Sequence, residues 1–224
     1  MRILNIASNI RLLKQSLPST VRLIAVSKTK TAEAIQEAYN EGQRCFGENR
    51  VGEILIKKDL LPADIEWHLI GHLQRNKVKM VIPFIGMIQS VDTFRLLSSI
   101  NSEAQKIGRV VDILLQIHIA REETKFGFSR EEIEEMIESS EFSDIRSVRI
   151  CGVMGMATFT SDTGLVQSEF RSLAESFRYL KMKYFSEDEN FREISMGMSG
   201  DYEIAIREGS TMIRVGSLIF GERS

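Results

Sequence analysis

The 224-residue sequence has few of the residues that cross-link small domains or bind metals: it contains two cysteines and three histidines. Cys45 and Cys151 stand far apart in apolar segments, which indicates reduced core residues of a cytoplasmic protein and neither a disulfide framework nor a CxxC metal site. His68 and His72, with Glu66, could suggest a metal. However, they fall on a strand that runs into a loop, and no carboxylate cluster completes the set, so we expect no metal.

An excess of charge and a long apolar run are also missing. With 29 basic and 31 acidic residues the net charge is -2, which gives no electrostatic reason to expect nucleic acid or an anionic membrane as a partner. The amino-terminal segment has apolar residues at helical spacing, interrupted by Arg11 and Lys14, so neither a signal peptide nor a membrane span is expected. The simplest interpretation is an amphipathic first helix that closes one end of the domain.

No proline- or glycine-rich linker divides the chain, and we expect one domain over residues 1–224. Apolar strand-like segments alternate with segments of helical spacing, which predicts an α/β fold, a single (β/α)8 TIM-type barrel with an extra amino-terminal helix. A doubly wound sheet is the structural alternative. The eight expected strands lie within residues 23–26, 44–49, 66–74, 86–92, 110–119, 149–157, 191–209 and 211–221.

Several helix boundaries can also be predicted. Ser129 with Glu132 forms a capping box before an apolar stripe, and Asp92 is placed to cap the helix that ends near Gly108. A long helix is expected over residues 162–184.

Lys28 follows the first apolar strand directly. Barrel enzymes place their chemistry at the carboxyl ends of the strands. An amine at the rim of an apolar interior is driven towards its neutral form, in which it can condense with a carbonyl. The alternative is a rim lysine whose ammonium extends into solvent.

Two glycine-containing turns predict a phosphate site. Ser199 and Gly200 precede a short helical segment, and Gly216 and Ser217 follow the last strand. In barrels, phosphate sites are often built from the loops after strands seven and eight. The alternative is two ordinary turns that need glycine for positive φ.

Arg214 lies two residues before Gly216 and should project to the same side of the last strand. If that side faces the barrel mouth, the guanidinium can donate to a ring nitrogen or to an anion. A salt bridge to a carboxylate inside the barrel is the alternative.

An amine on the first strand and a phosphate site after the last two would together hold an aldehyde that carries a phosphate. Pyridoxal 5'-phosphate fits this description, and sugar phosphates that form a Schiff base are a competing interpretation.

A series of motifs in one order resembles a known family. The motifs are AVSKTK, CFGEN, WHLIGHLQRNK, LLQIHIAREETKFG, GVMGMA and SMGMSGDYEIAIREGSTMIRVG, within residues 22–221. Together they resemble the pyridoxal phosphate homeostasis proteins (the YggS/PROSC family), which are similar in fold to the barrel domain of alanine racemase.

The resemblance implies a cytoplasmic vitamin B6 protein that holds pyridoxal phosphate as an internal aldimine on Lys28, with no established turnover. Arg214 would approach the pyridine ring, leaving it a poorer electron sink than an aspartate partner would. Apo forms of pyridoxal phosphate enzymes are the implied partners, and a monomer is expected. The implied contacts are Ser199, Gly200, Gly216 and Ser217 for the phosphate, Asn49 and His68 at strand ends, and Ser90 and Met154 as further lining residues.

The sequence departs from the family pattern at Arg50, Gly52 and His118, near the rim. An amino-acid racemase that uses Tyr202, His68 or His118 as its second base stays an alternative. In alanine racemase that second group comes from a further domain, which we do not expect after Ser224. A sugar-phosphate lyase is a third possibility.

Overall fold

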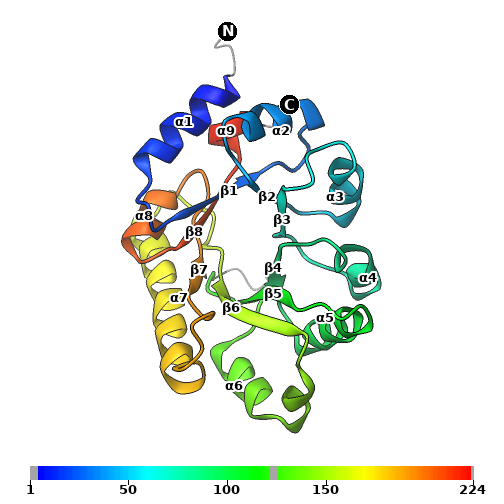
Figure 1. Cartoon of the computed structure of the whole chain (residues 1–224). Coiled ribbons are helices and arrows are strands. Elements are labelled where there is room, and N and C mark those ends of the chain that lie inside the picture. The colour runs from blue at the N-terminus through cyan, green and yellow to red at the C-terminus, as the bar shows by residue number, and fades with distance from the viewer. Residues whose placement is uncertain (1–4, 122–125, 223–224) are drawn as a thin grey trace.

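Within residues 5–121 and 126–222, which this computed structural model describes, eight parallel strands close into a barrel (Figure 1). Each strand pairs with the next along the chain, and β8 pairs with β1. The predicted (β/α)8 architecture is confirmed; residues 122–125 of the LLQIHIAREETKFG motif lie outside the described residues. The strands are β1 (Arg22–Val26), β2 (Cys45–Glu48), β3 (Glu66–Leu69), β4 (Met87–Val91), β5 (Val111–Gln116), β6 (Val148–Met154), β7 (Glu193–Ser195) and β8 (Met212–Val215).

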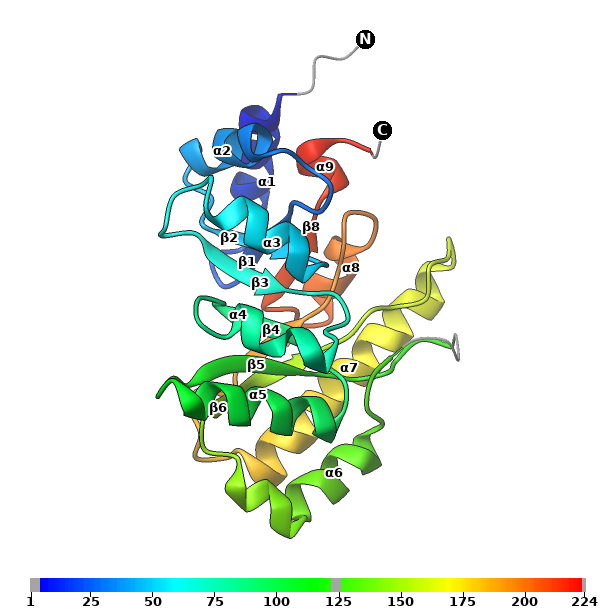
Figure 2. The same ribbon diagram turned by 90° about the vertical axis from the view of Figure 1, so that its right-hand side faces the viewer.

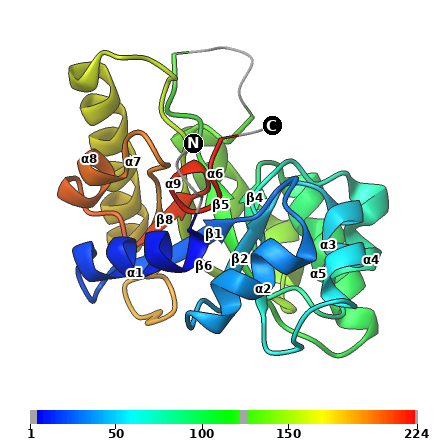
Figure 3. The same cartoon turned by 90° about the horizontal axis from the view of Figure 1, so that it is seen from above.

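Helices form an outer layer around the strands, as the views from the side and from above also show (Figures 2 and 3). None of the described helices is both long enough and apolar enough to cross a membrane. The helical elements are α1 (Ile6–Ser16), α2 (Ala32–Asn40), α3 (Val51–Lys58), η1 (Arg75–Lys77), α4 (Val78–Val81), α5 (Phe94–Lys106), α6 (Arg130–Glu138), η2 (Ser140–Asp144), α7 (Thr163–Tyr184), α8 (Tyr202–Arg207) and α9 (Ser217–Phe220).

The extra helix α1 belongs to this outer layer. Arg11 pairs with Glu41 at 2.9 Å, and the Asn9 side chain donates to the Ile219 carbonyl at 3.0 Å, so α1 packs beside α2 and α9. Figure 1 shows it outside the ring of strands, not across the end of the ring. The amino-terminal helix is therefore confirmed, but the expectation that it closes one end of the domain is wrong.

Side-chain caps fix several helix starts. The Ser129 and Glu132 capping box is present at α6, as predicted. At α5 the prediction is wrong: Thr93, not Asp92, is the N-cap and accepts from the Leu96 N–H, while Asp92 lies 3.0 Å from His72. A hydroxyl one position later satisfies the free N–H equally well, which leaves Asp92 available for the histidine.

Two strand ends differ from the expectation. β5 ends at Gln116, and His118 lies beyond it with its N–H donating to the Phe128 carbonyl at 3.0 Å. The segment after β8 is not only a turn, because residues 217–220 form the short helix α9. A segment of only four residues cannot distinguish a strand end from one helical turn by periodicity.

The apolar core has two parts. The larger lies between the strands and the surrounding helices, and a smaller cluster fills the barrel interior. Because side chains alternate across a strand, the inward positions form their own layer. The buried residues of the interior cluster are Ile24, Met87, Leu114, Cys151, Met154 and Met212.

Two glycines provide a test of local packing. A Cβ at Gly52, inside α3, would meet nothing within 4 Å, whereas at Gly152 it would lie 1.9 Å from the Glu193 carbonyl oxygen, on a backbone with φ 146. We expect Gly52→Ala to raise the free energy of unfolding by about 0.5–1 kcal/mol, because glycine is a poor helix former. Gly152→Ala should lower it by about 2 kcal/mol or more, since β6 and β7 would have to separate. Denaturant unfolding measures both, and a loss of stability in Gly52→Ala would contradict this reading.

Candidate cofactor-binding site

The pairing of β1 with β8 brings the predicted site together. Ile24 lies opposite Arg214 and Ala25 opposite Val215. One residue further on, a Cβ at Gly216 would lie 3.1 Å from the carbonyl oxygen of Val26. The loop after β8 therefore lies against β1 two residues before Lys28.

Lys28 lies in a tight turn at the carboxyl end of β1. It is half-buried, and the turn is closed by the Lys30 N–H, which donates to the Ser27 carbonyl at 3.0 Å. Thr29 has φ 65 and is the one described non-glycine residue with positive φ. A branched side chain rarely adopts this conformation, so other contacts must hold the turn.

The two predicted phosphate loops are joined directly. The Gly216 N–H donates to the Ser199 hydroxyl at 3.2 Å, and the Met198 N–H donates to the Asp201 carboxylate at 2.5 Å. Gly200 is exposed, with open space where a Cβ would stand. Among the described residues no hydrogen bond uses the N–H of Gly200 or of Ser217, the first residue of α9. These N–H groups are the kind of donors that an anion takes up.

Lys30 holds the second loop from behind, a role the sequence analysis missed. Its ammonium donates to the carbonyls of Phe220, Gly221 and Glu222 at 3.1, 3.4 and 3.3 Å. Hydrogen bonds from this cation satisfy carbonyl groups at the end of α9. Its positive charge also interacts favourably with the negative end of the helix dipole. The second lysine of AVSKTK was the available signal, but its partners are about 190 residues away in the chain.

Arg214 is buried and belongs to a hydrogen-bonded chain that crosses the barrel interior. Its guanidinium donates to Ser195 Oγ at 2.6 Å, and that hydroxyl donates to Gln89 Oε1 at 2.7 Å. Gln89 Nε2 lies 2.8 Å from His68 Nδ1, and His68 Nε2 lies 2.8 Å from Glu66 Oε1. Every donor in the chain points the same way, from a cation to an anion, which favours mutual polarisation.

This arrangement assigns a tautomer to the His68 ring. Since the Gln89 oxygen accepts from Ser195, its amide group must donate to Nδ1, and Nε2 therefore carries the proton that goes to Glu66. Both ring nitrogens of this buried side chain are used.

Arg214 itself also donates to the Gly155 carbonyl at 2.9 Å. These two hydrogen bonds of its guanidinium go to a hydroxyl and a carbonyl, not to a carboxylate. Burial lowers the pKa of Arg214 to about 10, and the nearby Asp201 charge opposes this shift. The guanidinium thus keeps its charge at neutral pH.

The other predicted lining residues lie at neighbouring strand ends. A Cβ at Gly71 would lie 2.6 Å from the Asn49 carbonyl oxygen, so the loops after β2 and β3 touch, and Ser90 donates its hydroxyl to the Gly71 carbonyl at 2.6 Å. Asn49 is half-buried, and Met154 is fully buried in the interior cluster. The structure gives Ser90 a role in holding a loop; cofactor contact by these three residues stays a prediction.

At the amino-terminal side of the strands, Cys45, Glu66 and His68 have potential ligand atoms within 4.8 Å of one another. Cys45 Sγ donates to Glu66 at 3.1 Å, and the cation of Arg22 lies 3.3 Å from the same carboxylate. Burial, followed by the Glu66 charge, raises the pKa of Cys45 to about 12. A protonated thiol and an arginine make this a hydrogen-bonded cluster in which a cation would have to displace existing partners.

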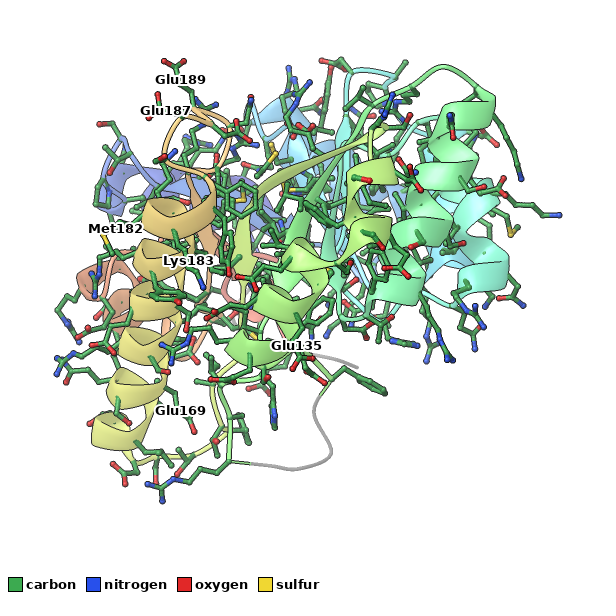
Figure 4. All side chains as sticks on the ribbon, turned by 90° about the horizontal axis from the view of Figure 1, so that it is seen from below. Glu135, Glu169, Met182, Lys183, Glu187 and Glu189 are labelled. Carbon is green, nitrogen blue, oxygen red and sulfur yellow. The ribbon has the colours of Figure 1, made fainter. Side chains whose placement is uncertain are left out.

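The loops after β5 and β6 are held by Glu169 of α7 (Figure 4). This buried carboxylate accepts from the Thr158 N–H at 2.6 Å, from its hydroxyl at 2.8 Å and from the Arg121 N–H at 3.3 Å. A cavity of about 650 Å³ in the described part of the chain is lined by Phe94, Phe128 and Met136 among others. None of its lining residues belongs to the predicted site.

The departures from the family pattern leave this framework untouched. Arg50 is exposed at the start of α3. A Cβ at Gly52 would meet no atom within 4 Å, so no neighbouring group depends on the residue at this position. His118 is half-buried after β5. Tyr202 lies on α8, and its hydroxyl donates to Glu203 at 3.4 Å.

Comparison with known proteins gives the class of protein first. The chain matches the family model of the alanine racemase N-terminal domain over residues 2–224. A solved structure of PipY from Synechococcus elongatus PCC7942 with PLP bound superposes with a TM-score of 0.88 at 35% sequence identity, covering 96% of this chain and 100% of that one. Fold and site thus define a barrel of the alanine racemase N-terminal class.

Relatives with similar sequences identify the family within this class. A protein of Aquifex aeolicus named pyridoxal phosphate homeostasis protein is 38% identical over 203 residues, 90% of this chain and 87% of the relative. A human protein of the same name is 37% identical over 211 residues, 90% of this chain and 76% of the relative. The chain belongs to the family of pyridoxal phosphate homeostasis proteins.

The hydrogen bond between His68 and Glu66 inside the barrel predicts that the stability of the protein depends on pH. The hydrogen bond from His68 outweighs burial and lowers the pKa of Glu66 to about 2, from an ordinary 4.5. A depressed pKa stabilises the folded state above pH 4.5, and this contribution is lost as the pH falls from 4.5 towards 2. We expect the free energy of unfolding of Glu66→Gln to fall less steeply over this range than that of the wild type. Urea unfolding at several pH values measures this. If the free energy of unfolding changed equally with pH in both proteins, the assigned role of the carboxylate would be contradicted.

Proposed function

We propose that this chain binds pyridoxal 5'-phosphate covalently through Lys28 and takes part in intracellular pyridoxal phosphate homeostasis. The observation that carries the proposal is the closure of the barrel by β1 and β8, which brings the Lys28 turn against the loop of Gly216. The names of the relatives and the PLP-bound PipY structure support it.

The aldehyde and the phosphate of the cofactor each have a counterpart among the residues of the chain. Pyridoxal phosphate supplies an aldehyde that condenses reversibly with an amine, with loss of one water. Lys28 provides the amine. Ser199, Gly200 and Ser217 provide hydroxyl and N–H donors for the phosphate, and Gly216, whose N–H donates to the Ser199 hydroxyl, joins the two loops that hold it.

Arg214 is the group we assign to the ring nitrogen. A guanidinium only donates hydrogen bonds, so beside the nitrogen it disfavours ring protonation and weakens the ring as an electron sink. This suits storage and exchange of the cofactor better than carbanion chemistry. Asn49, His68, Ser90 and Met154 complete the proposed lining.

The wider setting is also part of the proposal. We place the protein in the cytoplasm, as one domain over residues 1–224 and as a monomer, with apo forms of pyridoxal phosphate enzymes as recipients. Its two free cysteines are consistent with a reducing compartment.

The covalent link is tested by absorbance and by trapping. Wild-type protein mixed with pyridoxal phosphate should turn yellow, and borohydride should fix the cofactor to the peptide that contains Lys28. Lys28→Ala should lose both signals, while Lys58→Ala, on α3, should keep them. Trapping on another lysine would contradict the assignment. Inversion of an amino acid that is lost in Lys28→Ala would favour the racemase instead.

The phosphate loops are tested by comparing two ligands. Ser199→Ala should weaken binding of pyridoxal phosphate by about tenfold, or about 1.4 kcal/mol, because one hydrogen bond to a charged phosphate is lost. Binding of pyridoxal, which lacks the phosphate, should be unchanged. Equal losses for both ligands would show that the serine does not hold the phosphate.

A further inference from the structure

Behind the Lys28 turn, on the outer side of the barrel, lies a buried cation. Lys57 of α3 is 7% exposed, and its ammonium donates to Glu48 Oε1 at 2.7 Å, to Glu53 Oε2 at 3.0 Å and to the Ser27 carbonyl at 2.9 Å. An ammonium has three protons, so all of its donors are used. We refer to Glu48, Glu53 and Lys57 as the ion triad.

The ion triad holds both neighbours of Lys28. The Ser27 hydroxyl donates to Glu48 Oε1 at 2.7 Å, and the Thr29 N–H donates to Glu53 Oε2 at 2.8 Å. The residue before Lys28 is thus fixed through its hydroxyl and its carbonyl, and the residue after it through its N–H. The backbone of Lys28 has little freedom left between them.

The turn needs such support. Its third residue, Thr29, has φ 65, where a turn of this kind ordinarily requires glycine. A branched residue in this conformation persists only when the surrounding structure over-determines it. The Glu53 carboxylate on the Thr29 N–H is the contact that acts on this residue directly.

Burial of these ions is costly. Desolvation raises the pKa of Glu48 above its usual range, although the hydrogen bonds from Lys57 and Ser27 oppose this, and Glu48 Oε2 is buried without a hydrogen-bond partner among the described residues. Apolar side chains of similar volume would pack a helix against a strand at least as stably. A buried cation aimed at one turn is therefore better explained by the geometry that it imposes than by stability.

We propose that the ion triad is a positioning device that holds the strained turn of residues 27–30 and so directs the Lys28 amine towards the phosphate loops. The inference rests on the proposed function, since it concerns how Lys28 meets the cofactor. The three residues act through the turn and do not touch the cofactor themselves.

Glu53→Ala gives the cleanest test, because it frees the Thr29 N–H and leaves the pair of Lys57 with Glu48 intact. The rate of covalent attachment of pyridoxal phosphate should fall by about tenfold or more, because displacing a reacting group by about 1 Å can cost about a hundredfold in rate. Without cofactor, the peptide containing residues 27–31 should lose protection from hydrogen exchange. The matched control is Glu103→Ala, which removes the surface partner of Lys106 on α5 and should change neither measurement.

A second substitution separates positioning from stability. Thr29→Gly removes the strain, so in the Glu53→Ala background it should restore most of the attachment rate even if the melting temperature stays low. A double variant as slow as Glu53→Ala alone would overturn the proposal. So would an unchanged attachment rate in a folded Glu53→Ala protein.

If single changes in the ion triad prevent folding, Lys57→Met combined with Glu48→Gln removes both buried charges together. This variant should fold and attach the cofactor slowly, and a wild-type attachment rate would overturn the inference. Failure of the wild type to attach pyridoxal phosphate at all would refute the proposed function instead.

Discussion

The structure depends on the closure of the barrel between β1 and β8. Their pairing joins segments about 190 residues apart and places Arg214, Gly216 and the end of β1 side by side. Glycine at position 216 permits the close approach, because a Cβ there would crowd the Val26 carbonyl. The Lys28 turn from the start of the chain and the loops of Ser199 and Gly216 from its end lie near one another because the strands close a ring.

Two polar networks then hold the site, one on each side of the barrel wall. Inside, hydrogen bonds link Glu66, through His68, Gln89 and Ser195, to Arg214 and fix the guanidinium. Outside, the ion triad fixes the Lys28 turn. Strands position backbone well but leave loop residues free, so the side chains that meet a ligand need hydrogen bonds of their own. Both networks carry buried charge, which is the cost of a defined geometry at the rim.

Much of this could be predicted from the sequence. Alternating strand and helix patterns gave the barrel, and glycine with serine after the last two strands marked the loops that Ser199 and Gly216 join. The networks as a whole could not be predicted, because most of their contacts join different elements, such as Lys57 of α3 with Glu48 of β2, and no local pattern encodes those contacts. Lys57 reads as part of an ordinary helix, and Gln89 as one polar residue in an apolar strand. Short segments were the other weakness, since Thr93 in place of Asp92 and the four-residue α9 differ from expectation by a single residue or turn.

The central claim is that one site, built where β1 meets β8, grips the cofactor at both ends. A crystal structure of the protein loaded with pyridoxal phosphate tests it most directly. The account predicts continuous density from Lys28 Nζ to the cofactor, its phosphate hydrogen-bonded by the loops of Ser199 and Gly216, and its ring nitrogen facing Arg214. Cofactor bound elsewhere, or a phosphate turned away from these loops, would contradict it.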